Sequence, residues 1–145
     1  MDRQQFCTRL NDRRNELGMS WLDLTIASKI NSSTLRKILS GNINSFMKSG
    51  MAIADALKCN IVVRKCDESV NITPDTLTEW LQISLKEAGL SINKFYDQVG
   101  LTRVAVTANL KGASKLRFDT FLTWAKVTGY MVEIVPRKSD CESSN

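Results

Sequence analysis

The chain of 145 residues contains no histidine and only two prolines. Without histidine it lacks the commonest general base and the usual activator of a nucleophile. The sequence also contains no phosphate-binding loop. No apolar run approaches the roughly 20 residues that span a bilayer, and the N-terminal MDRQQF is polar where a secretory signal turns apolar. We therefore expect a cytoplasmic protein that is not an enzyme and has no membrane partner.

Cysteine is also scarce, and none of the four thiols belongs to a CxxC pair. They are Cys7, Cys59, Cys66 and Cys141. Because histidine is missing, a structural zinc site would require all four cysteines from scattered positions. The simpler prediction is that the thiols are reduced and that the protein holds neither a metal ion nor another cofactor.

Positive charge is present in moderate excess, with 20 Lys and Arg against 15 Asp and Glu and a formal net charge of +5. Residues 1–65 contain eleven basic and five acidic residues, and residues 74–138 contain nine and six. Both halves are therefore basic. An excess of this size favours an acidic partner without identifying it.

The sequence repeats itself without a gap at an offset of 71 residues, which places Glu16 on Glu87. Identical residues and apolar positions coincide in the two copies. The matches include Gly18 with Gly89, Ser20 with Ser91, Leu39 with Leu110, Gly41 with Gly112, Leu10 with Leu81 and Leu35 with Val106. Because core positions and helix-ending glycines recur together, we expect two copies of one structural unit.

Each copy predicts four helices followed by one short strand. In the first copy the helices cover about residues 3–17, 20–28, 31–40 and 45–58, before a β-prone run at 60–64. In the second they cover about 73–88, 91–99, 102–111 and 117–128, before a run at 130–135. Side chains that cap helices and Pro74 predict the starts, and glycines predict several of the ends.

The predicted fold is mainly α-helical, with a first unit at 1–65, a linker at 66–72, a second unit at 73–138 and a disordered tail at 139–145. A single strand is not stable alone, so the strands at 60–64 and 130–135 need partners. Either they pair with each other across an approximate two-fold axis as a small antiparallel ribbon, or they pair with the strands of a second chain in a homodimer.

Two segments, Ser20–Gly41 and Ser91–Gly112, follow the pattern of a helix, a three-residue turn and a second helix. Both end in Leu-x-Gly and share apolar residues in the turn and early in the next helix, which are Ile30 and Leu35 in one and Leu101 and Val106 in the other. Both segments resemble the helix-turn-helix of the lambda-repressor and Cro family. The resemblance implies two tandem repressor-like units that bind specific double-stranded DNA as a pseudo-dimer and regulate transcription on the nucleoid, in the manner of a repressor.

The first segment departs from the family pattern at its turn. Lys29 occupies the position of the turn glycine, which is Gly100 in the second segment. Lys29 must adopt a left-handed backbone at a cost of roughly 1–2 kcal/mol, or the turn must differ locally.

The resemblance assigns the first residues of each third helix to base edges in the major groove. These residues are Ser32, Ser33, Thr34 and Lys37 in the first unit and Arg103, Val104 and Thr107 in the second. Arg103 is the clearest candidate, since a guanidinium can bond both O6 and N7 of guanine, and Val104 suits a thymine methyl group. Arg36 and Lys37 either contact DNA or form a solvated pair.

Phosphate contacts are implied at the amino end of the second helix and in the loop after the third. The residues at these places are Trp21, Asn42, Asn44, Asn93, Lys111 and Lys115. A basic cluster on the first helix is either a solvated face or a further phosphate contact, and it consists of Arg9, Arg13 and Arg14.

A protein partner is the alternative to DNA, because the same helical scaffold can bind proteins. The chain would then be an interaction protein, such as a phage- or plasmid-type inhibitor or an antitoxin-like partner, and residues 130–136 could offer it a strand edge. A basic surface on the third helices favours DNA, whereas an exposed apolar strand edge favours a protein.

Overall fold

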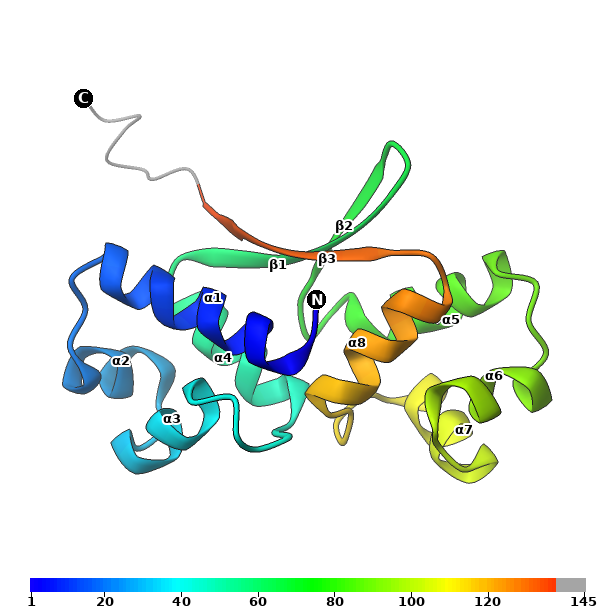
Figure 1. Ribbon diagram of the computed structural model, residues 1–145, viewed down its shortest axis with the longest axis horizontal. Coiled ribbons are helices and arrows are strands. Elements are labelled where there is room, and N and C mark those ends of the chain that lie inside the picture. Colours follow the sequence, from blue (N-terminus) through cyan, green and yellow to red (C-terminus); the bar gives the residue numbers. More distant parts are fainter. Residues whose placement is uncertain (138–145) are drawn as a thin grey trace.

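The computed structural model describes residues 1–137 and is mainly helical, with a small three-stranded antiparallel sheet (Figure 1). The first elements are α1 (Arg3–Glu16), α2 (Trp21–Ser28), α3 (Ser32–Leu39), α4 (Met47–Ala56), β1 (Cys59–Lys65) and β2 (Glu68–Ile72). They are followed by α5 (Leu77–Glu87), α6 (Ile92–Val99), α7 (Arg103–Lys111), α8 (Phe118–Val127) and β3 (Met131–Pro136). None of these helices is long and apolar enough to cross a membrane. The tail predicted at 139–145 lies outside the described residues.

Polar side chains begin the second and third helices of each half, as predicted. Ser20 Oγ accepts a hydrogen bond from the amide of Asp23 at 3.0 Å, and the Asp23 carboxylate accepts one from the Ser20 amide at 3.2 Å. Ser91, Asn31 and Thr102 each accept a bond from the amide three residues further on. These bonds satisfy amides that have no partner within the helix, so these short helices begin at defined residues.

The turn between α2 and α3 contains a lysine in the left-handed conformation. Lys29 has φ 62° and ψ 25°, close to the φ 71° and ψ 25° of Gly100 between α6 and α7. Of the two alternatives for Lys29, the structure shows the left-handed backbone, and the two turns share one geometry. This conformation costs a residue with a Cβ roughly 1–2 kcal/mol.

Replacing Lys29 with glycine is expected to raise the free energy of unfolding by up to about 1 kcal/mol. Glycine adopts this backbone without strain, and its greater freedom in the unfolded chain offsets part of the gain. Urea unfolding followed by circular dichroism measures the change. The control Lys29→Ala removes the same charge but keeps the Cβ, so it should give no gain. An equal gain in both variants would place the cost in the lysine side chain rather than in its backbone.

The two halves are related by an approximate two-fold axis. Phe46 and Arg117 are counterparts at the offset of the repeat, and they pair with each other in an isolated antiparallel bridge. In the sheet, the counterparts Val62 and Glu133 are also directly paired. A residue that pairs with its own counterpart marks a two-fold axis. Residues 45–46 contribute to the bridge, which is why α4 begins later than the sequence predicts.

The sheet has the strand order β2-β1-β3, which corrects the prediction that residues 66–72 are only a linker. Cys66 and Asp67 form a tight turn, with Cys66 at φ 54°, and the chain returns as β2 antiparallel to β1. Val70 and Ile72 pack against the core, while the residue between them is exposed. This alternation is the sequence signal that the prediction missed.

β1 and β3 pair with each other across the axis, which is the first of the two predicted alternatives. Ile61 lies opposite Ile134 in this pairing. Because β2 occupies the other edge of β1, the strand at 60–64 has no free edge for the alternative homodimer contact.

α5 begins later than predicted, because Thr73 does not cap it. The Thr73 amide donates to Oγ1 of Thr76 at 2.9 Å, and the amide of Leu77 donates to the carbonyl of Thr73 at 2.9 Å. Residues 73–76 therefore form a hydrogen-bonded turn that leads into the helix. Pro74 lies in this turn, where its fixed φ is tolerated.

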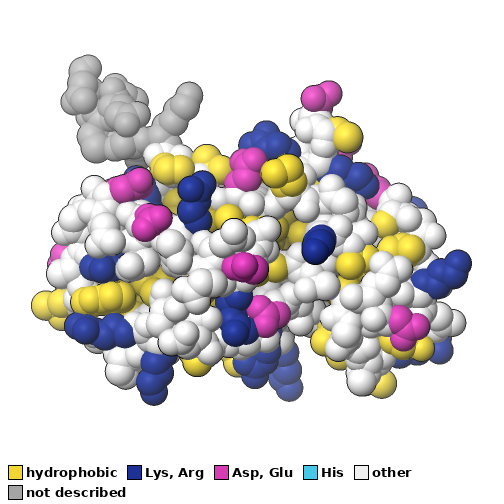
Figure 2. Space-filling model, viewed as in Figure 1, with side chains coloured by type: hydrophobic (Ala, Val, Ile, Leu, Met, Phe, Trp, Pro, Cys, Tyr) yellow, Lys and Arg dark blue, Asp and Glu magenta, His cyan; other side chains and the backbone are white. Residues whose placement is uncertain are grey.

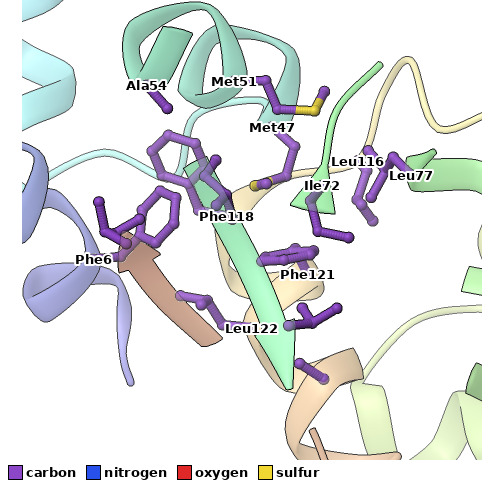
Figure 3. Packing of buried hydrophobic residues seen from close by; sticks show 14 of the residues in the cluster. Phe6, Met47, Met51, Ala54, Ile72, Leu77, Leu116, Phe118, Phe121 and Leu122 are labelled. Carbon is purple, nitrogen blue, oxygen red and sulfur yellow. The ribbon is translucent and has the colours of Figure 1, made fainter. Parts of the chain in front are cut away.

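Buried side chains from both halves form one continuous core (Figure 3). Phe118 of α8 lies where the halves meet, with its ring centroid 5.1 Å from that of Phe6 in α1. It also packs closely on α4, because a Cβ added to Gly50 would lie 2.6 Å from Cε1 of Phe118. The predicted boundary between the units therefore does not separate two cores, and we expect the halves to unfold together.

Candidate nucleic-acid interface

α3 and α7 lie on the same face of the molecule, away from the sheet and on either side of the approximate two-fold axis (Figure 1). α2 and α6 lie beside them, toward the two ends of the long axis. Each pair joins through the left-handed residue described above, at Lys29 or Gly100. One surface therefore presents two equivalent short helices whose starts are fixed by caps.

α3 exposes three of its predicted contact residues, Ser33, Arg36 and Lys37, while Ser32 and Thr34 are half-buried. The hydroxyl of Ser33 donates to Oδ1 of the capping residue Asn31 at 2.9 Å. This leaves the Ser33 oxygen free to accept a bond. Within residues 1–137 the Lys37 ammonium forms no hydrogen bond or ion pair, so it is available to an external anion.

Trp21 connects three helices rather than projecting freely toward a phosphate. The indole is half-buried, with Cζ of Arg14 4.0 Å and Cζ of Arg36 5.1 Å from the ring centroid. A guanidinium over an aromatic face is favourable, so Trp21 holds Arg36 at the surface of α3. No sequence pattern indicates this arrangement, because Arg14, Trp21 and Arg36 lie on three different helices.

α7 exposes Arg103 and Val104 in its first turn, and Thr107 is half-buried one turn later. The guanidinium of Arg103 forms no hydrogen bond or ion pair with any other residue in the range 1–137. Val104 is 79% exposed. An apolar side chain in such a position buries little surface and so contributes little to the stability of the fold. Both side chains are therefore accessible at the start of α7.

The predicted phosphate contacts fall into two groups. Asn42, Asn93, Lys111 and Lys115 are exposed on or near the α3–α7 face. Asn44 is different, because its Oδ1 accepts a bond from the amide of Asp119 at 3.0 Å and its carbonyl accepts one from Arg117 at 2.7 Å. Asn44 thus joins the two halves at the axis.

The segments that form α3, α7 and the loops after them carry charge of one sign. Residues 32–46 and 103–117, which run from the start of α3 or α7 to the next helix, contain six basic residues and no acidic residue. Figure 2 shows Lys and Arg side chains projecting along this edge of the molecule. Arg117, which the prediction did not include, lies near the axis with its Cζ 4.2 Å from the centroid of the Phe46 ring. Such a surface attracts a polyanion.

Three of the four arginines of α1 bond or stack within the fold, while Arg9 is exposed. Arg3 forms an ion pair with Asp119 at 2.6 Å, and Arg13 donates to the carbonyl of Leu57 at 3.0 Å. Arg14 stacks on Trp21, as described above. Much of the larger positive charge of the first half therefore belongs to side chains that bond or stack within the molecule.

The buried cysteines are poor candidates for chemistry. Burial raises the pKa of both Cys7 and Cys59 to about 11, so these thiols stay protonated at neutral pH. Among residues 1–137 there is no group of three Cys, Asp or Glu side chains placed to hold a metal ion.

Comparison with known proteins finds no matching family model, curated protein or solved structure. The feature that remains is the pair of helices α3 and α7, whose segments contain basic but no acidic residues.

Proposed function

We propose that this protein binds double-stranded DNA in a sequence-directed manner through α3 and α7, as two tandem repressor-like helix-turn-helix units, and regulates transcription. One observation carries the proposal: two equivalent, capped helices share a face whose segments contain basic but no acidic residues. A major groove about 12 Å wide admits such a helix. The approximate two-fold axis suits half-sites about one turn of DNA apart, the arrangement found for dimers that bind this way.

The two helices would read different half-sites. α3 begins with Ser-Ser-Thr, whereas α7 begins with Arg-Val-Ala. A hydroxyl side chain can contact several bases, but an arginine prefers guanine and valine suits a thymine methyl group. A single chain should therefore select an asymmetric site in which the α7 half is the more sharply defined.

Selection from a random pool of duplex DNA tests the proposed function. The protein should enrich one motif within repeated rounds at low salt, and the logarithm of its affinity should fall linearly with the logarithm of salt concentration. Enrichment of no motif would refute sequence-directed binding. Binding of the whole pool with the same salt dependence would leave only a general attraction to nucleic acid.

Arg103→Ala is expected to relax the preference at one base position and to cost about 1–3 kcal/mol on the selected site. The same change on unrelated DNA should cost much less, because the lost contact is to a base edge. Lys111→Ala is the matched control, since a phosphate contact contributes equally on both sequences. Competition binding on the selected and a shuffled duplex separates the two effects. A uniform loss for Arg103→Ala would make it a phosphate contact instead.

A further inference from the structure

A cleft of about 350 Å³ opens between α4, the start of α5 and the loop after α7. It adjoins a second hollow of about 430 Å³ between α4, β1 and the turn before α5, and Lys48, Met51 and Pro74 line both. In Figure 3 the Met51 side chain extends from α4 toward the segment that carries Ile72 and Leu77. We call the two hollows together the α4–α5 cleft. Volumes of this size are typical of sites for small molecules.

The equivalent place on the other side of the two-fold axis is bridged by an arginine. At the offset of the repeat, three residues that line the cleft have these counterparts: Pro74 with Arg3, Gly112 with Gly41 and Lys48 with Asp119. The Arg3 guanidinium donates from Nε to the carbonyl of Gly41 at 3.1 Å and from Nη1 to Asp119 at 2.6 Å. One side chain thus joins all three positions on that side, whereas Pro74 leaves the space between its neighbours open.

The charge at this place differs in sign between the two sides. Asp119 binds the cation of Arg3 on one side, and Lys48 takes the position of Asp119 on the other. Among the described residues the Lys48 ammonium has no hydrogen bond or ion pair. The other charged groups that line the cleft, Asp55 and Arg137, lie 2.9 Å apart and pair with each other. Lys48 is therefore the charge that an occupant of the cleft meets, and it attracts an anion.

The hydroxyl of Thr78 supplies a second polar contact in the cleft. Its Oγ1 accepts a hydrogen bond from the amide of Ala113 at 3.3 Å. Its own proton is donated to no acceptor within residues 1–137, so it is available to a ligand. Most of the remaining lining is apolar and includes Met51, Ile72 and Leu77. A few polar groups in a largely apolar hollow are the arrangement that orients a small ligand.

We propose that the α4–α5 cleft binds a small apolar molecule with one carboxylate, whose anionic end contacts Lys48 and Thr78 and whose hydrocarbon body lies against Met51. Burial of the hydrocarbon supplies most of the affinity, and the carboxylate sets the orientation. Residues 138–145 of the chain contain no large apolar side chain, so they do not match this lining. Because α4 and α5 belong to different halves, the ligand contacts both halves. The inference does not depend on DNA binding.

Titration of the full chain with octanoate, followed by its amide resonances, tests the inference. Amides of residues 48–55, 74–78 and 112–114 should shift until the site is saturated, whereas those of Arg3 and Gly41 at the counterpart should not. Octan-1-ol has the same hydrocarbon chain without the charge, so it should bind about tenfold more weakly, as expected for the loss of a hydrogen bond between charged groups. No saturable shift in the millimolar range would overturn the site. Equal binding of acid and alcohol would overturn its preference for a carboxylate.

Lys48→Asp gives the cleft the charge of its counterpart and provides the second arm. It should lower the affinity for octanoate by about tenfold or more, and it should create binding of octylammonium at the same amides. Aspartate is favourable in the first turn of a helix, so α4 should stay folded, which urea unfolding checks. Lys94→Asp makes the same change in the first turn of α6, outside the cleft, and should bind both probes as the parent does. Equal responses of the two variants would mean that net charge alone attracts the probes, and would overturn the inference.

Discussion

Replacing Phe118 with alanine is expected to lower the free energy of unfolding by about 3–5 kcal/mol, a large share of the 5–15 kcal/mol that is typical of a folded protein. The side chain is 0% exposed, lies against Phe6 of α1 and fills the space that Gly50 of α4 leaves open. Alanine would leave a cavity between three helices that come from both halves of the chain.

Urea unfolding followed by circular dichroism and by tryptophan fluorescence measures this loss. Phe118→Leu keeps most of the side-chain volume, so it should cost less than half as much as alanine. Because the halves share one core, the two signals should fall in a single transition in the parent and in both variants. A loss below about 1 kcal/mol for alanine would mean that the helices close the cavity. Two separate transitions would mean that the halves are independent units.

The parts of the fold that the sequence predicts are those decided by neighbouring residues. A serine, asparagine or threonine that caps a helix acts within three residues, and Lys29 and Gly100 set their turns by their own backbone. The repeat strengthens each of these signals, because the same residue types recur at the same spacing. For this reason the caps and turns of the second and third helices could be predicted within one or two residues.

The parts that the sequence does not predict are those decided by contacts across the molecule. β2 is an exception, because it pairs with the adjacent strand β1; its alternating residues were a local signal, but the Cys66–Asp67 turn contains no glycine that is typical of a hairpin. From the sequence, Asn44 is predicted to contact a phosphate from a loop. In the structure its side chain instead accepts a hydrogen bond from the amide of Asp119 in the second half. Local spacing cannot show which polar side chains the packing of the two halves will use.

The candidate site divides in the same way. The position of Arg103 follows from the cap and turn before α7, so the sequence alone places it at the surface. Arg36 is exposed as well, but its stacking on Trp21 depends on the packing of α3 against α2. The sequence shows that residues 32–46 and 103–117 contain no acidic residue. Only the structure shows that these two segments lie on one face.

Removing four positive charges from that face should reduce affinity for the selected DNA by more than about a hundredfold. The variant combines Arg36→Gln, Lys37→Gln, Arg103→Gln and Lys111→Gln, all exposed positions on α3 and α7. Glutamine keeps a polar side chain of similar length, so the helices should remain folded. Each lost phosphate contact should also make the dependence of log affinity on log salt shallower by about 0.9. Fluorescence anisotropy over a range of salt concentrations gives both quantities.

A variant with the same loss of charge elsewhere decides whether the face or the net charge is responsible. Arg9, Lys58, Lys86 and Lys126 are exposed on or at the ends of α1, α4, α5 and α8, away from α3 and α7. Their replacement by glutamine lowers the net charge equally, but it should change affinity only a few-fold, because charges more than a Debye length of about 8 Å from the DNA are largely screened at physiological salt. Equal losses in the two variants would refute binding through α3 and α7. A large loss in the first variant alone would locate the DNA on the surface where the two halves bring their third helices together.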